Sequence, residues 1–131
     1  MPYTLSQFKE VLDGLGYNLG PDGLNGNNGN SLDVFTQAAI RELQTYYGLP
    51  VTGKLDSATD YFVQKIVRNL QHSLNAVVDA QLPVNEFYGP RTVQAMKSFQ
   101  RTYGLPMTGI ANLTVRELLD AEAKKHAIAT A

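Results

Sequence analysis

The sequence predicts an all-α protein in which two similar three-helix bundles follow one another along the chain and share one long helix. Three observations predict this fold: an internal repeat, apolar residues at helical spacing in both copies, and a junction without helix-breaking residues. The chain has 131 residues and is 44% hydrophobic, as is usual for a globular protein. A bundle of about 60 residues is only marginally stable alone, so two bundles that share a core would stabilise each other.

The internal repeat relates residues 36–53 to residues 92–109. The pattern Gln-x-x-Tyr-Gly-Leu-Pro-x-Thr-Gly occurs at 44–53 and again at 100–109, with every fixed position identical. Chance does not plausibly give this pattern twice in so short a chain. The two halves are therefore predicted to share one fold.

The first helix of copy one is predicted over about residues 4–15, and Gly16 ends it. Its buried face consists of apolar residues at helical spacing: Leu5, Phe8, Val11, Leu12 and Leu15. The corresponding face of copy two consists of Val67, Leu70, Leu74, Val77 and Val78, before Pro83.

The second helix of each copy leads into the repeated pattern. Its apolar face is Ala39, Ile40, Leu43 and Tyr47 in copy one, and Ala95, Met96, Phe99 and Tyr103 in copy two. Gly48 and Gly104 follow at the position where helices favour a left-handed residue. Pro50 and Pro106 then prevent continuation. A third helix is expected to begin at an N-cap, Asp56 or Asn112.

The junction between the copies contains neither Gly nor Pro from residue 57 to residue 82. Apolar residues recur there at every fourth position: Phe62, Ile66, Leu70, Leu74 and Val78. This spacing predicts one continuous helix that joins the copies into a rigid body. A short break near residues 67–69 is the alternative. The predicted repeats are 1–66 and 67–131, the second with a C-terminal helical tail.

A segment rich in Gly, Asn and Asp precedes the second helix of copy one. It makes copy one about seven residues longer than copy two, with the insertion at about 25–33. Its composition predicts turns. A flexible loop and a polar loop that contacts a ligand or calcium are both open, although Asp22 and Asp33 are the only carboxylates and no Glu closes an EF-hand pattern.

Composition argues against several classes of function. A net charge of −1 gives no basic face for nucleic acid, and no apolar run reaches the 18 residues of a transmembrane helix. The first residues lack the pattern of a signal peptide. The sequence has no Cys, two isolated histidines (His72 and His126) and scattered carboxylates, so we expect no enzyme, no cofactor and no metal site.

The motifs together resemble the type 1 peptidoglycan-binding domain. Copy two matches the family's pattern at 70–74, 87–92, 95–100, 104–105, 108–109 and 114–118. Copy one matches at 15–17, 22–26, 36, 39–40, 43–44, 48–49, 52–53 and 59. Copy one lacks the Gly-Pro before Thr36, and copy two has Asn85-Glu86 where the family has Asp-Gly.

The resemblance implies a non-catalytic protein that binds peptidoglycan, through its glycan or its stem peptide. Without Trp, tyrosines are the candidates for stacking on sugars. Arg91 could pair with a peptide carboxylate. Gln44 and Gln100 could bind ligand or only fix a loop, and Tyr103 could belong to the core. The candidate ligand contacts are Asp22, Asn25, Gln44, Tyr46, Tyr88, Arg91, Thr92, Gln100 and Tyr103.

Two other functions stay open. One is an intracellular adaptor that kept the fold, lost the wall ligand and binds a protein partner. The other is an accessory targeting module of a cell-wall hydrolase. The resemblance implies the cell envelope, whereas the N-terminal sequence makes the cytoplasm an alternative.

Overall fold

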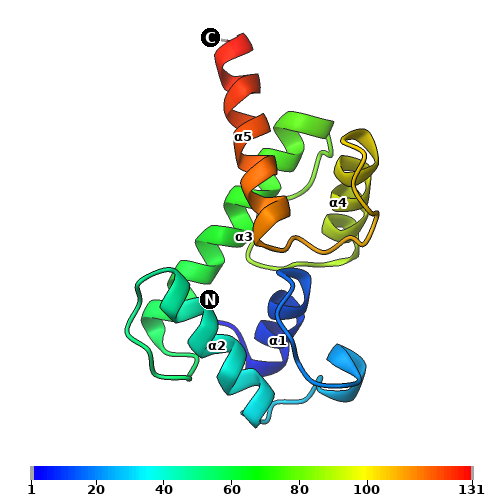
Figure 1. Ribbon diagram of the computed structural model, residues 1–131. Coiled ribbons are helices and arrows are strands. Elements are labelled where there is room, and N and C mark those ends of the chain that lie inside the picture. Colours follow the sequence, from blue (N-terminus) through cyan, green and yellow to red (C-terminus); the bar gives the residue numbers. More distant parts are fainter. Residues whose placement is uncertain (1, 131) are drawn as a thin grey trace.

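The computed structural model describes residues 2–130 and is all-helical over that range (Figure 1), which confirms the predicted fold class. Its elements are α1 (Leu5–Gly14), a short 3-10 helix η1 (Gly23–Gly26), α2 (Val34–Tyr46), α3 (Ser57–Val78), α4 (Pro90–Thr102) and α5 (Leu113–Thr130). None of the helices within residues 2–130 combines the length and the apolar character that a membrane span requires.

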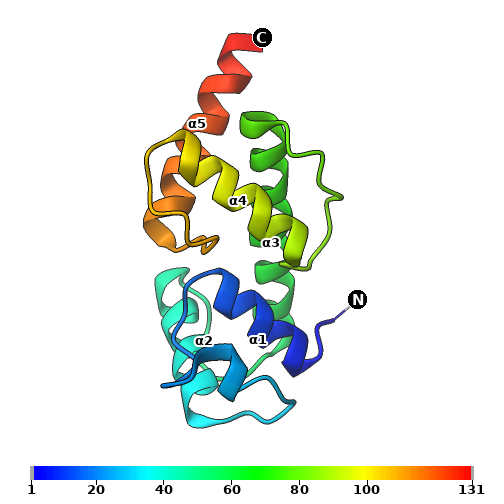
Figure 2. The same ribbon diagram turned by 90° about the vertical axis from the view of Figure 1, so that its right-hand side faces the viewer.

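α3 is the common element of both bundles. The ribbon views show α1 and α2 around its first half and α4 and α5 around its second half (Figures 1 and 2). The helix has 22 residues and is unbroken between residues 67 and 69, as the spacing of apolar residues predicts. It ends earlier than expected, because the Asn75 side chain bonds the backbone N–H and carbonyl of Leu82 at 2.7 and 3.0 Å and turns the chain back.

The core follows the predicted apolar faces. In copy one Phe8, Leu12, Ile40 and Leu43 are fully buried, and in copy two Leu74, Met96 and Phe99 are fully buried. Val67 lies at the middle of α3 and is also fully buried. The predicted faces of α1, α2 and α4 therefore point inward.

The repeated turn has the same conformation in both copies. Gly48 and Gly104 have φ values of 69° and 70°, which only glycine adopts without strain. The N–H of Leu49 then donates to the carbonyl of Gln44 at 2.9 Å, and Leu105 repeats this contact with Gln100 at 2.8 Å. These bonds satisfy carbonyls that the helix end would leave unpaired.

The two predicted N-caps are also confirmed. The backbone N–H of Thr59 donates to the carboxylate of Asp56 at 2.9 Å, and that of Val115 donates to the side-chain oxygen of Asn112 at 3.0 Å. Hydrogen bonds from the backbone and side chain of Thr59 lower the pKa of Asp56 below its ordinary value.

Replacing Asp56 with alanine should lower the free energy of unfolding by about 1 kcal/mol at pH 7. Because the folded pKa is lowered, the carboxylate stabilises the protein above its unfolded pKa of about 3.9 and stops doing so as the pH falls through the folded pKa. Urea unfolding of both proteins at pH 7 and at about pH 2.5 measures this difference. If the difference in the free energy of unfolding between the two proteins is as large in acid as at pH 7, the role of the Asp56 carboxylate as an N-cap is contradicted.

Candidate functional site

Buried glutamines connect helices to the loops that carry the family motifs. The amide nitrogen of Gln44 donates to the Thr59 and Thr52 hydroxyls at 2.9 and 3.0 Å, and its oxygen accepts from the N–H groups of Thr52 and Gly53. Gln100 repeats the arrangement: its nitrogen donates to the Thr108 hydroxyl at 3.1 Å, and its oxygen accepts from Gly109 at 2.8 Å. The repeated glutamine thus fixes the repeated turn.

A third glutamine, Gln71 of α3, fixes the loop before α4. It donates to the carbonyl of Phe87 at 2.8 Å and to the hydroxyl of Thr92 at 3.3 Å, and it accepts from the N–H of Asn85 at 2.7 Å. The Asn85-Glu86 departure from the family pattern therefore still supplies a bond to this glutamine. The loop keeps a defined shape.

Copy one has a lysine where copy two has Gln71. The sequence resemblance places Leu15-Gly16-Tyr17 at the family's Leu-Gln-x-x-Leu motif, which in copy two contains Leu70, Gln71 and Leu74 of α3. In the structure, the buried residues of α1 with the same spacing are Phe8, Lys9 and Leu12. Lys9 is only 1% exposed, and its ammonium donates to the Asn27 side chain at 2.8 Å and lies 3.9 Å from the Asp33 carboxylate. The insertion supplies the oxygen that this longer, charged side chain needs.

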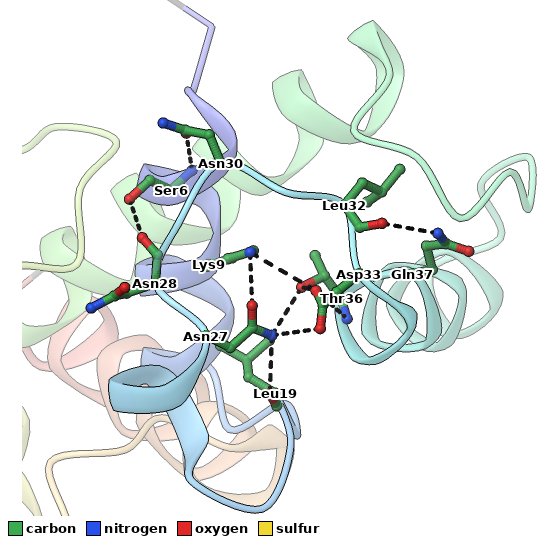
Figure 3. Close-up of polar contacts among 10 residues, drawn as sticks. All are labelled: Ser6, Lys9, Leu19, Asn27, Asn28, Asn30, Leu32, Asp33, Thr36 and Gln37. Atoms are coloured by element: carbon green, nitrogen blue, oxygen red, sulfur yellow. Dashed lines mark hydrogen bonds and ion pairs between the residues drawn. The ribbon is translucent and has the colours of Figure 1, made fainter.

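The Lys9 cluster, which consists of Lys9, Asn27, Asp33 and Thr36, holds the insertion against α1 (Figure 3). The Asn27 amide donates to the Leu19 carbonyl at 3.0 Å and to the Asp33 carboxylate at 2.9 Å. Asp33 also caps α2 by accepting from the backbone and hydroxyl of Thr36. One buried ammonium therefore joins α1, the insertion and α2.

The rest of the insertion is also bonded to α1. The hydroxyl of Ser6 donates to the carbonyl of Asn28 at 2.7 Å, and the N–H of Ser6 donates to the Asn30 side chain at 2.8 Å (Figure 3). A 3-10 turn at Gly23–Gly26 adds local structure that the sequence did not predict. In the described part of the chain, no group of three or more His, Cys, Asp or Glu residues could hold a metal ion.

Replacing Lys9 with methionine should lower the free energy of unfolding by about 2 kcal/mol, because Asn27 loses a donor and Asp33 loses its nearest cation. The Asp33 side chain is 29% exposed, so solvent screening limits the free energy that is lost. Urea denaturation measures the change. Lys65→Met, at an exposed lysine of α3, is the matched control, and equal midpoints for the two variants would contradict a structural role for Lys9.

The two copies pack directly on one another at the junction. The Tyr88 ring lies on Gly14 so closely that a Cβ there would be 2.4 Å from its Cδ1 atom. The Tyr88 hydroxyl donates to the carbonyl of Gly109 at 2.7 Å, and burial raises the pKa of Tyr88, which keeps this donor protonated. The N–H of Ala111 also donates to the carbonyl of Gly14 at 2.7 Å. The end of α1 is thus bonded to copy two.

Arg116 of α5 reaches across the same junction. Its guanidinium donates to the carbonyls of Leu15 and Ala111 at 3.0 and 2.6 Å, and to the Tyr47 hydroxyl at 3.2 Å. Leu15 and Tyr47 belong to copy one, whereas Arg116 and Ala111 belong to copy two. This side chain therefore holds the two copies in one relative orientation.

Two neighbouring hollows open at the junction on either side of Arg116, and residues of both copies line each of them. The first hollow has a volume of about 320 Å³ and is lined by Tyr47, Phe62, Ile66, Asn69, Leu70, Ser73, Arg116, Leu119 and Asp120. The second hollow has a volume of about 360 Å³ and is lined by Leu15, Gly16, Tyr17, Glu42, Tyr46, Asn112, Leu113, Thr114 and Arg116. Both volumes fall near the lower end of the range of ligand pockets.

An aromatic row connects the two hollows. The rings of Tyr46 and Tyr47 meet edge to face with centroids 4.8 Å apart, and the rings of Tyr47 and Phe62 are also 4.8 Å apart. Tyr46 is 54% exposed, so its side chain can reach a ligand from solvent. Apolar ring faces beside polar rims suit a carbohydrate, which has both apolar C–H faces and hydroxyl groups.

The predicted contact residues fall into two groups. The polar atoms of Gln44, Tyr88, Thr92 and Gln100 are buried and bonded within the protein, so these residues shape the loops and the junction. The other five reach the surface at least in part.

Of these exposed candidates, Asp22 and Asn25 lie on the insertion, and Tyr46 lines the second hollow. Arg91 donates to the Gln81 carbonyl at 3.1 Å, and the Tyr103 hydroxyl donates to Glu122 at 3.2 Å.

Of all the candidate contact residues, only Tyr46 lines one of the two hollows beside Arg116, whereas Tyr88 lines a further hollow of about 510 Å³ between the copies. Tyr47 is one of the tyrosines considered for stacking on sugars, and the other lining residues carry no ligand signal in the sequence. Arg116 occupies a variable position inside the family's Thr-x-x-x-Leu motif, and in the sequence Phe62 is only one of the apolar residues at helical spacing in α3. Asn69 and Ser73 have no motif of their own. Only the packing of α5 against α3, together with the bond from Arg116 to Tyr47 at the end of α2, brings these positions together.

Comparison with known proteins identifies the family. A family model described as "Putative peptidoglycan binding domain" matches twice, at residues 4–60 and 64–119. A protein of Synechococcus elongatus named "Putative OxPP cycle protein OpcA" is 39% identical over 72 residues, which cover 54% of this chain and 15% of that protein. The chain thus matches a small part of this relative. No solved structure matches.

The matched ranges include the repeated turns, the buried glutamines and both halves of α3. They cover most of the chain, and the two matches agree with the internal repeat and with the two stacked bundles. The chain therefore belongs to the peptidoglycan-binding domain family and contains two tandem copies of that domain.

Proposed function

We propose that the protein binds bacterial peptidoglycan without catalysis and acts in the cell envelope. The observation that carries the proposal is the pair of family domains fused into one body, with hollows of ligand size where they meet. The family is one of binding domains, and the buried polar groups of its motifs are used to fix loops. Recognition is therefore left to exposed side chains and to the hollows.

A rigid junction favours binding of an extended polymer. Arg116 and Tyr88 fix both copies before any ligand arrives, so binding does not require the domains to be ordered relative to one another. Preorganised sites lose less entropy on binding than flexible ones. A polymer with many identical units also presents many sites, which raises the effective affinity of a small domain.

Co-sedimentation with purified peptidoglycan sacculi tests the proposed function. The protein should pellet with sacculi and stay in the supernatant without them, and the turbidity of the sacculi should not fall during incubation. Protein that stays in the supernatant at every sacculus concentration would refute wall binding. A fall in turbidity would refute the absence of catalysis.

A second candidate is a protein-binding module within a larger protein. Two observations favour it: the Synechococcus relative is named for the OxPP cycle rather than for the wall, and this chain matches only 15% of it. Exposed apolar side chains at Val34 and Phe35 offer a contact surface on α2. Capture of one protein partner by the purified chain, together with no pelleting on sacculi, would favour this candidate.

A further inference from the structure

We propose that the paired hollows at the junction bind the glycan strand of peptidoglycan rather than its stem peptide, with neighbouring sugars on the two sides of Arg116. This inference rests on the proposed function and names the site and the part of the polymer that it recognises. Residues of both copies line each hollow, so the site exists only because two domains are fused.

The residues that line the first hollow suit a sugar ring. Ile66, Leu70 and Leu119 supply apolar surface, and Tyr47 and Phe62 add ring surface. Asn69 and Ser73 add an amide and a hydroxyl, which both donate and accept hydrogen bonds. A pyranose has the complementary pattern, with C–H groups on its faces and hydroxyl or N-acetyl groups at its edge.

The second hollow continues the same surface toward copy one. The exposed ring of Tyr46 stands beside Tyr47, and Glu42, Asn112 and Thr114 supply polar groups at the edge. Arg116 lines both hollows, so a ligand that passes over it enters both. Two sites that share one residue match two consecutive units of a chain better than two separate ligands.

The charges of the hollows favour the glycan over the peptide. Arg116 is the only cation among the lining residues, and it already donates to two carbonyls and to Tyr47. Asp120 in the first hollow is a carboxylate that pairs with Lys124 at 3.0 Å, and Glu42 in the second hollow is also a carboxylate. Among the lining residues no cation is thus left to pair with the free carboxylates of a stem peptide, whereas the neutral hydroxyl and N-acetyl groups of a glycan can donate hydrogen bonds to Glu42 and Asp120.

Binding measurements with defined probes test the assignment. Titration calorimetry of the full chain should show binding of a β-1,4-linked N-acetylglucosamine tetramer and no binding of stem peptides released from sacculi by amidase. In a ¹⁵N-labelled sample the tetramer should shift the amide signals of Asn69, Ser73 and Thr114. Binding of the peptides in place of the tetramer would overturn the assignment.

Two variants remove contacts without touching the core. Tyr46→Ala and Asn69→Ala should each weaken binding of the tetramer by about three- to tenfold, because one stacking or hydrogen-bonding contact is lost. Tyr61→Ala is the matched control, since Tyr61 is 65% exposed on the same copy but lies outside both hollows. The control should bind like the unmodified protein.

The outcomes separate this inference from the proposed function. If the unmodified protein does not pellet with sacculi, wall binding fails and the glycan site fails with it. If it pellets and the Tyr46→Ala, Asn69→Ala double variant pellets equally well, the junction site is refuted while wall binding stands. Loss of pelleting in the double variant alone, with circular dichroism unchanged, supports the glycan site.

Discussion

Replacing Asn69 with proline should lower the free energy of unfolding by about 3 kcal/mol or more. Asn69 is exposed in the middle of α3, so its side chain contributes little to the core. Proline there lacks the N–H that closes a helical hydrogen bond, and its ring clashes with the preceding turn. A kink at this point also moves the two halves of α3 apart from the orientation that Arg116 and Tyr88 require.

The control for this change is Asn69→Ala, which removes the same side chain and keeps the backbone hydrogen bond. Alanine is a strong helix former, so this variant should unfold within about 0.5 kcal/mol of the unmodified protein. Urea denaturation followed by circular dichroism compares the three proteins. If the proline variant has the same free energy of unfolding as the alanine variant, α3 is not a continuous helix in solution.

Replacing Gly14 with alanine should lower the free energy of unfolding by about 2 to 3 kcal/mol. The added Cβ would lie 2.4 Å from Cδ1 and 2.5 Å from Cγ of the Tyr88 ring, well inside van der Waals contact. Tyr88 is buried and its hydroxyl bonds Gly109, so the ring has little room to move. The strain arises at the contact between the copies. Thermal unfolding of the variant and of the unmodified protein measures the loss of stability.

Gly29 provides the matched control for Gly14. A Cβ at Gly29 meets no atom within 4 Å, and neither glycine has a positive φ. Gly29→Ala should therefore leave the melting temperature nearly unchanged. In a double-mutant cycle, Tyr88→Leu should make Gly14→Ala less costly, because the ring that the methyl group meets is gone. If Gly14→Ala lowers the free energy of unfolding by the same amount with Tyr88 in place and in the Tyr88→Leu variant, the copies do not meet at Gly14.

The helices could be predicted because their signals are local. Apolar residues at helical spacing, the N-cap Asp56 and the glycine-proline turns at Gly48 and Gly104 all act within a few residues of their own position. The repeat then supplied each element twice. The continuous helix followed from the absence of any breaker near its centre.

The insertion and the junction could not be predicted, since they depend on contacts between distant residues. Lys9 reads as a surface residue of an amphipathic helix, and only Asn27 and Asp33 of the insertion explain its burial. Arg116 likewise contacts Leu15, 101 residues earlier in the chain. Aligning Phe8-Lys9 with Leu70-Gln71 would have indicated that Lys9 replaces a loop-fixing glutamine. The candidate ligand contacts and the boundary at residues 66 and 67 stay predictions.

The central claim is that the two domains form one cooperative unit through α3, Tyr88 and Arg116. Differential scanning calorimetry of the full chain tests this claim most directly. We expect a single transition whose calorimetric and van't Hoff enthalpies are equal. Two resolved transitions, or a calorimetric enthalpy about twice the van't Hoff value, would show that the domains unfold independently and would contradict the shared junction.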